Sequence, residues 1–268
     1  MKRTWLVLSP HFDDAVLSIP LWMSQQVDKG DRVVVATLFS AGDPDDPGEM
    51  KIRQAEDKQA MALLACESVH LGFTDAPYRN PPRTSFMPIV FGAIESDESL
   101  ITPLKRTIEN LLAHYPDTRI VAPLAVGTHI DHRLSFLASI NHACYFYEDR
   151  PYALIRGAVT HRLTQLGARA PLDKNEMTEF VKDYLHAGYV QTFLNTREIP
   201  HAKRLLLLQN KSCDVSLNLR PMSVEASNSE QTTTAGRAIM AYTSQLDDLF
   251  PNGLDTFWTR ETLWEKVK

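Results

Sequence analysis

Cysteine is scarce in this chain and shows no metal-binding pattern. The 268 residues contain three cysteines, far apart and without a CxxC pair: Cys66, Cys144 and Cys213. An odd number of widely spaced cysteines argues against the disulfide framework of a small secreted protein, and the missing CxxC argues against a thiolate zinc site. We therefore expect a cytoplasmic protein.

Long hydrophobic runs and an excess of basic charge are also missing. No stretch approaches the roughly 18 apolar residues of a membrane-spanning helix, and no small-residue cleavage site follows the short apolar stretch near the N-terminus. The net charge is −5, with 44% hydrophobic and 23% charged residues, as in an ordinary globular protein. We expect neither a membrane nor a nucleic acid as a partner.

The hydrophobic pattern predicts an α/β fold. Continuous apolar, β-branched runs at 4–9 and 32–40 are typical of strands buried on both faces of a parallel sheet, and the segment between them has the length of a helix. The pattern continues with a helix, a strand, a helix and a strand at 53–65, 68–73, 100–115 and 119–126. This alternation predicts a Rossmann-like, mostly parallel sheet with helices on both faces.

We expect a single catalytic domain over residues 1–268, because an α/β unit of this length can fold around one sheet. Residues 1–150 would supply the core sheet with both of the motifs described below. Residues 151–268 would form a less regular C-terminal extension that completes the fold and the substrate pocket. The elements predicted in that extension are a strand and two helices, at 156–163, 175–194 and 230–250.

Two clusters of potential metal ligands follow predicted strands. The first holds His11, Asp13 and Asp14 in SPHFDD, and the second holds His129, Asp131 and His132 in GTHIDHR. In a doubly wound sheet, ligands bind beyond the carboxyl ends of the strands, so the two clusters could surround one ion. Histidine nitrogen and carboxylate oxygen are suitable ligands for Zn(II), and two histidines with one carboxylate also suit Fe(II). Either cluster alone is typical of a turn, but the pair predicts a catalytic metal site.

The paired clusters resemble the HxDD and HxDH motifs of the PIG-L/LmbE-like family of zinc-dependent N-deacetylases. RQAEDKQAMALL, at 53–64, is similar to the Arg-x-x-Glu helix of that family, and LGFTDAPYR, at 71–79, to its LGF.D segment. The resemblance covers residues 4–150 in order and spacing, and weaker similarities to a bacterial subgroup follow. One departure is Ala15, where the family has Glu.

The resemblance implies a role for the residues of the first cluster and for His132. It implies that the zinc ligands are His11, Asp14 and His132. Asp13 would stay off the metal and act as the general base that takes a proton from water. General acid and base catalysis of this kind contributes roughly two to four orders of magnitude in rate.

The resemblance also implies roles for three residues around the substrate. His129 would face the substrate carbonyl as a protonated electrophile and later give a proton to the amine. Asp131 would orient His129 and favour its charged form, because a nearby carboxylate raises the pKa of a histidine. Arg53 would contact a sugar hydroxyl or brace the zinc loop; the alternative is an exposed ion pair with Glu56 that contributes little.

The predicted reaction is zinc-dependent hydrolysis of an N-acyl group, most simply N-acetyl, on an amino sugar or aminoglycoside-like small molecule. Three alternatives stay open: an amidase that acts on a thiol-sugar conjugate, a metal-dependent phosphoesterase, and a non-catalytic sugar- or nucleotide-binding module. No GxGxxG follows the first strand and the chain has no P-loop, which argues against the binding module. The exact substrate and a homo-oligomeric state are left open by the sequence.

Overall fold

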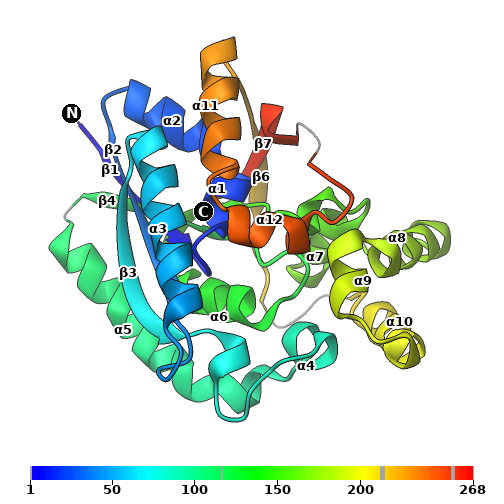
Figure 1. Ribbon diagram of the computed structural model, residues 1–268. Coiled ribbons are helices and arrows are strands. Elements are labelled where there is room, and N and C mark those ends of the chain that lie inside the picture. The colour runs from blue at the N-terminus through cyan, green and yellow to red at the C-terminus, as the bar shows by residue number, and fades with distance from the viewer. Residues whose placement is uncertain (1, 116, 212–214, 255–256, 268) are drawn as a thin grey trace.

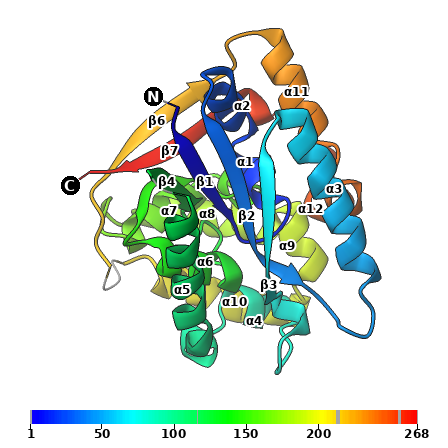
Figure 2. The same ribbon diagram turned by 90° about the vertical axis from the view of Figure 1, so that its left-hand side faces the viewer.

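The computed structural model describes residues 2–115, 117–211, 215–254 and 257–267. Its centre is a seven-stranded sheet in the order β3-β2-β1-β4-β5-β7-β6 (Figures 1 and 2). The strands are β1 (Thr4–Ser9), β2 (Arg32–Ala41), β3 (Glu67–Thr74), β4 (Thr118–Pro123), β5 (Ala143–Tyr147), β6 (Leu219–Glu225) and β7 (Arg260–Lys266). The first five run parallel, and β7 pairs antiparallel with β5 and β6. The predicted α/β fold with a mostly parallel sheet is confirmed.

Helices cover both faces of the sheet (Figure 2). On one face lie α1 (Asp14–Ser18), α2 (Pro20–Asp28), α3 (Gly48–Leu64), α11 (Ser229–Ile239) and α12 (Thr243–Leu249). The core of the other face includes α4 (Phe86–Val90), α5 (Glu98–His114), α6 (Ile130–Ser139), α7 (Ala158–Gln165), α8 (Lys174–His186), α9 (Gly188–Phe193) and α10 (Ile199–Leu208).

The first strand shows why its sequence is apolar throughout. Trp5 and Val7 pack into the core on one face of the sheet, while Leu6 and Leu8 pack into the core on the other. Because successive side chains of a strand point to opposite faces, a strand covered on both sides needs apolar residues at every position. The unbroken apolar run of β1 follows from this burial.

The sheet order places the two motifs side by side. β1 lies between β2 and β4, with Thr4 beside Thr118 in the parallel register. The helices after these two neighbouring strands, α1 and α6, belong to the cores on opposite faces. In doubly wound sheets such a reversal opens a crevice beyond the carboxyl ends of the strands. SPHFDD and GTHIDHR both border that crevice.

The C-terminal extension differs from its predicted elements. Residues 156–163, predicted as a strand, largely form the helix α7, which is packed in a helical layer. Short apolar runs do not distinguish a buried helix from a strand, and here the tertiary packing decides. The predicted helix at 175–194 is broken before Gly188, where a Cβ atom would lie 2.7 Å from a side-chain carbon of Pro251.

Two further differences concern the end of the chain. The helix predicted at 230–250 is divided into α11 and α12 by Met240–Tyr242. The antiparallel strands β6 and β7 were not predicted. The edge strand β6 carries Arg220 and Glu225, and β7 carries four charged residues, so neither has the unbroken apolar run of a buried strand.

The structure describes two of the three cysteines and nearly all of the helical segments. Cys66 and Cys144 are free thiols, and Cys213 lies outside the described residues. Within the described ranges, no helix combines the length and hydropathy needed to cross a bilayer.

Candidate active site

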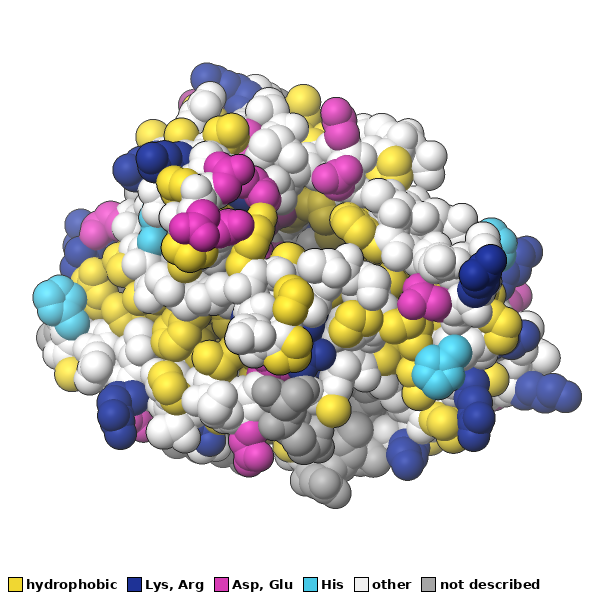
Figure 3. Space-filling model, turned by 60° about the horizontal axis from the view of Figure 1, so that its bottom comes forward, with side chains coloured by type: hydrophobic (Ala, Val, Ile, Leu, Met, Phe, Trp, Pro, Cys, Tyr) yellow, Lys and Arg dark blue, Asp and Glu magenta, His cyan; other side chains and the backbone are white. Residues whose placement is uncertain are grey.

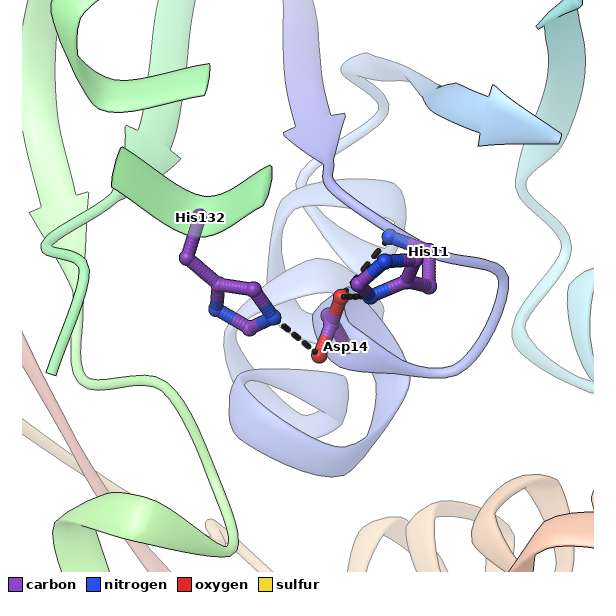
Figure 4. Close-up of side chains that lie close together, drawn as sticks. All are labelled: His11, Asp14 and His132. Atoms are coloured by element: carbon purple, nitrogen blue, oxygen red, sulfur yellow. Dashed lines mark hydrogen bonds and ion pairs between the residues drawn. The ribbon is translucent and has the colours of Figure 1, made fainter. Parts of the chain in front are cut away.

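Three side chains from the two motifs meet beyond the ends of β1 and β4 (Figure 4). His11 Nδ1 lies 3.1 Å from Asp14 Oδ2, and His132 Nε2 lies 3.3 Å from Asp14 Oδ1. One ligand atom from each residue can be chosen so that all lie within 4.8 Å of one another. All three residues are buried. The predicted proximity of the two motifs is therefore confirmed, and this group can hold a metal ion.

The loop between β1 and α1 sets the first half of the site. Ser9 Oγ donates a hydrogen bond to the His11 carbonyl at 2.5 Å and accepts one from the Ala15 amide at 3.1 Å. The His11 amide donates to Asp14 Oδ2 at 2.7 Å. Ala15 is fully buried in the core beside α1, so the position where the family has Glu faces the packed interior here.

A buried carboxylate orients His132 from behind. His132 Nδ1 lies 2.7 Å from Asp149 Oδ1, and the Val126 amide donates to Asp149 Oδ2 at 2.9 Å. Burial lowers the pKa of His132, but the carboxylates of Asp14 and Asp149 outweigh this and raise the pKa to about 9. A carboxylate on one imidazole nitrogen directs the other nitrogen at the metal position, as is usual for histidine ligands of metals.

Asp131 contacts His11 instead of His129. Asp131 Oδ2 lies 3.1 Å from His11 Nε2, and the other carboxylate oxygen accepts a hydrogen bond from Arg79. The expectation that the Asp131 carboxylate orients His129 is therefore wrong. At the start of α6 the fully buried Asp131 side chain points to the first motif. Ligand atoms of His11, His129 and Asp131, one from each, also lie within 4.8 Å of one another, but the hydrogen bond to His129 comes from the Asp131 backbone amide, which donates to Nδ1 at 3.2 Å.

The surroundings of His129 favour its neutral form. Burial, followed by repulsion from His11 and His132, places the pKa of His129 well below its usual value. The role of His129 as a protonated electrophile stays a prediction, and this shift in pKa runs against it. Because Nδ1 accepts the Asp131 amide, the neutral ring carries its proton on Nε2 and can donate a hydrogen bond from there.

Asp13 is buried beside Arg53. Asp13 Oδ1 accepts no hydrogen bond from the described part of the chain, and Arg53 Nη2 lies 3.5 Å away. Burial and then the charge of Asp14 raise the pKa of Asp13, whereas Arg53 lowers it. A buried carboxylate oxygen that forms an ion pair but accepts no hydrogen bond from the described residues can take a water or substrate proton.

Arg53 does not form the exposed ion pair considered as its alternative. Its side chain is buried, and Arg53 Nη1 lies 3.5 Å from Asp75 Oδ2. Glu56 points instead to the start of α12, where it accepts hydrogen bonds from the Thr243 hydroxyl and from the Ser244 amide and hydroxyl. Arg53 therefore braces the loop that holds Asp13.

Several residues of the site lie outside the two motifs. Asp75 and Asp149 each follow a strand, as the two motifs do, and polar residues after predicted strands are the sequence signal that points to them. Tyr189 and Phe193 also line the pocket above the metal-binding group. They come from α9 in the irregular C-terminal extension, where no sequence signal points to a site.

The family is now identifiable. The profile of the PIG-L family, described as GlcNAc-PI de-N-acetylase, matches residues 6–142, which is just over half of the chain. The chain belongs to the PIG-L family. Membership confirms the resemblance stated from the motifs and the expected class of enzyme, a hydrolytic N-deacetylase. Both motifs of this PIG-L chain lie inside the matched range.

Two solved structures share the fold of this PIG-L protein over nearly the whole chain. Teicoplanin deacetylase Orf2, in a zinc-inhibited form, is 19% identical with a TM-score of 0.65 and covers 98% of both chains. The A40926 pseudoaglycone deacetylase Dbv21 is 19% identical with a TM-score of 0.61, covering 99% of this chain and 97% of its own. No curated protein sequence matches this chain. The C-terminal extension is thus part of the shared fold.

Proposed function

We propose that this PIG-L protein is a zinc-dependent N-deacetylase that hydrolyses the N-acetyl group of an amino sugar or an aminoglycoside-like small molecule. The observation that carries the proposal is the meeting of His11, Asp14 and His132 beside an Asp13 carboxylate oxygen that pairs with Arg53 and accepts no hydrogen bond from the described residues. The profile of de-N-acetylases and the two structurally similar deacetylases support it.

The residues of the site suit zinc. Two imidazole nitrogens and one carboxylate oxygen form the three-ligand set of a catalytic zinc site, and each histidine has a buried carboxylate at its other nitrogen. Fe(II) would accept the same ligands. When bound, such an ion polarises the amide carbonyl and makes water more acidic.

Asp13 and His129 handle the protons in the proposed reaction. The Asp13 carboxylate takes a proton from the attacking water, whose oxygen bonds to the carbonyl carbon. His129 Nε2–H donates a hydrogen bond to the carbonyl oxygen as negative charge develops there. The C–N bond then breaks, the proton passes to the leaving amine nitrogen, and acetate and the free amine are released. Arg53 holds Asp13 and lies in the pocket lining, where it can also contact a sugar hydroxyl.

We also propose that residues 1–268 act as one catalytic domain in the cytoplasm. The strands β6 and β7 of the C-terminal extension continue the sheet of residues 1–150, and α9 and α12 supply pocket residues. The two free thiols fit a reducing compartment. The oligomeric state, for which the sequence allowed a homo-oligomer, stays open.

Release of free amine tests the proposed function directly. Zinc-loaded protein is incubated with a panel of N-acetylated amino sugars and aminoglycosides, with a chelator control and the Asp13→Ala variant beside it. We expect metal-dependent amine release that Asp13→Ala abolishes. Release from no member of the panel would contradict the proposal. Amine release from a thiol-sugar amide, or phosphate release from a phosphate ester in a parallel assay, would replace it.

A further inference from the structure

Arg79 lies behind the metal-binding group of His11, Asp14 and His132, away from the pocket that opens over it. Its side chain is 8% exposed and lines a separate groove of about 550 Å³, and the described residues around that groove include none that line the pocket. Most Lys and Arg side chains on the face where the parallel strands end lie at the margin of the molecule (Figure 3). A guanidinium that is buried instead needs charged or hydrogen-bonding partners, because an unpaired buried charge is costly.

The three nitrogens of the Arg79 guanidinium each have an acceptor. Nε donates to the Thr74 carbonyl at 3.1 Å, Nη1 donates to Asp97 Oδ1 at 3.4 Å, and Nη2 donates to Asp131 Oδ1. The guanidinium carbon also lies 4.7 Å from the centre of the Phe39 ring, which packs in the core of the sheet. Because a guanidinium is planar and rigid, partners in these different directions fix its orientation.

A second arginine fixes Asp97, the outer partner of Arg79. Arg83 donates from Nη2 to Asp97 Oδ2, and from Nη1 to the Pro88 carbonyl at 3.0 Å. The side chains of Arg83 and Asp97 are 11% and 8% exposed, so their charges pair with little competition from water. Ion pairs therefore run without a break from the groove toward the metal site, in the order Arg83, Asp97, Arg79 and Asp131.

Asp131 carries this fixed orientation to the metal ligand His11. While Oδ1 accepts from Arg79, Oδ2 accepts from the Ala76 amide at 3.2 Å and lies 3.1 Å from His11 Nε2. The other nitrogen of that ring, Nδ1, lies 3.1 Å from Asp14 in the metal-binding group. Since a carboxylate at one imidazole nitrogen sets the direction of the other, a turn of Asp131 would turn His11 away from the metal position.

A second carboxylate lies close enough to compete for the same nitrogen of His11. Asp75 Oδ1 lies 3.3 Å from His11 Nε2, and Asp75 also lines the pocket. A neutral imidazole whose Nδ1 faces a metal carries one hydrogen on Nε2, which makes one well-directed hydrogen bond. Arg79 favours the bond to Asp131, because it fixes that carboxylate beside His11 and so leaves Asp75 facing the pocket.

We propose that Arg79 is a positioning residue of the metal site, which holds His11 in its metal-binding orientation by fixing the carboxylate of Asp131. The inference rests on the metal ligands of the proposed function, and it goes beyond that function by giving a role to the arginine behind them. Arg79 is not among the described residues that line the pocket, so its effect should appear in metal binding rather than in substrate contacts.

Arg79→Lys tests orientation because it keeps the positive charge. A lysine ammonium is a single point charge on a flexible chain, so it cannot face the three acceptors in the fixed directions of a guanidinium. We expect zinc affinity, measured by competition with a chromophoric chelator, to fall about tenfold. The loss lies at the low end of the usual range for such partners because Asp75 can still accept from His11. Wild-type affinity in a variant that circular dichroism shows to be folded would overturn the inference.

Arg162→Lys is the matched control for the loss of a buried guanidinium. The guanidinium carbon of the buried Arg162 also lies 4.7 Å from a ring centre, that of Phe136, and its Nε donates to the Leu124 carbonyl at 2.8 Å. Denaturant unfolding of the metal-free proteins should show both variants destabilised, but only Arg79→Lys should lose zinc affinity. An equal loss of affinity in both variants would reduce the effect to a disturbed core and overturn the inference.

A double-mutant cycle tests whether Arg79 acts through Asp131. Zinc affinity is measured for Arg79→Lys, for Asp131→Asn and for the double variant. If the arginine acts through the carboxylate, Arg79→Lys should change the affinity by less than about twofold once Asp131→Asn is present. A further loss of about tenfold in the double variant would show an independent route and overturn the inference.

Bound Co(II) gives a readout that needs neither zinc nor turnover. Its visible absorption depends on the arrangement of its ligands, so the spectrum should change in Arg79→Lys and stay as in the wild type in Arg162→Lys. A spectrum and a zinc affinity that depend on Arg79, without amine release from any N-acetylated compound, would contradict the proposed function alone. Amine release with a metal affinity that does not depend on Arg79 would overturn this inference alone, and a wild-type chain that binds no metal would overturn both.

Discussion

His132 lies between two buried carboxylates, with Nδ1 2.7 Å from Asp149 and Nε2 3.3 Å from Asp14. Asp149 uses a separate carboxylate oxygen for each of His132 and the Val126 amide, and an Asn side chain keeps only one of these two oxygens. We expect Asp149→Asn to lower zinc affinity about 10- to 100-fold, measured by competition with a chromophoric chelator. Glu148→Gln, which keeps an acceptor for Trp264 Nε1, is the neighbouring control. Wild-type affinity in Asp149→Asn would show that Asp149 does not support the metal site.

Asp13 and His132 should separate catalysis from metal binding. Asp13→Asn keeps the size of the side chain and removes the base, so turnover should fall by roughly two to four orders of magnitude while zinc is retained. His132→Ala removes a proposed ligand and should lose zinc. Elemental analysis and the amine-release assay on the same preparations check both outcomes. Full activity in Asp13→Asn would refute its role as the base.

Substitution of Asp131 tests whether its carboxylate supports His11, which it contacts in the structure, or orients His129, as the sequence suggested. Because its carboxylate contacts His11, Asp131→Asn should weaken zinc binding, whereas His129→Gln should leave zinc bound and reduce turnover. Zinc titration and kcat are measured for both variants. If Asp131→Asn matched His129→Gln, with zinc affinity unchanged, the carboxylate would act through His129 after all.

Glu56 ties α3 to α12 and so bears on stability. It is buried and accepts three hydrogen bonds from Thr243 and Ser244, at 2.7–2.9 Å. Glu56→Ala leaves these groups without their partner and should lower the free energy of unfolding by about 2–4 kcal/mol. Denaturant unfolding measures it, with Lys58→Ala as an exposed control on the same helix. A change within 0.5 kcal/mol, roughly that of a surface substitution, would be incompatible with this link.

His161 makes stability depend on pH. It is buried against Phe180, with Nε2 3.3 Å from the Leu206 carbonyl, and burial lowers its pKa to about 4. A depressed folded pKa gives stability that is complete above the unfolded value of about 6.5 and is lost as the pH falls toward 4, by at most about 1.4 kcal/mol per pH unit. His161→Phe should flatten this dependence, and the exposed His201→Gln should not. Denaturant titrations at pH 7, 6 and 5 compare them; identical slopes would exclude the effect.

Local patterns account for what could be predicted. The apolar runs of β1, β2 and β4 indicated a parallel sheet because each strand is buried on both faces, and that burial is written in consecutive residues. The two motifs follow β1 and β4, so the rule that ligands bind at the carboxyl ends of strands brought His11 and His132 together. In the C-terminal extension this reasoning failed, because α7 is too short for its pattern to distinguish a helix from a strand, and the edge strand β6 is not an unbroken apolar run.

The sequence by itself determined the order of the strands and longer helices through residue 126, the two motifs and, through their resemblance, the family. Only the tertiary structure decided which atoms face one another: Asp131 toward His11, Arg53 toward Asp13, and Phe193 into the pocket. The physical reason is sequence separation. Strand and helix periods depend on neighbours a few residues apart, whereas these contacts join residues 40 or more positions apart and follow from how the layers pack.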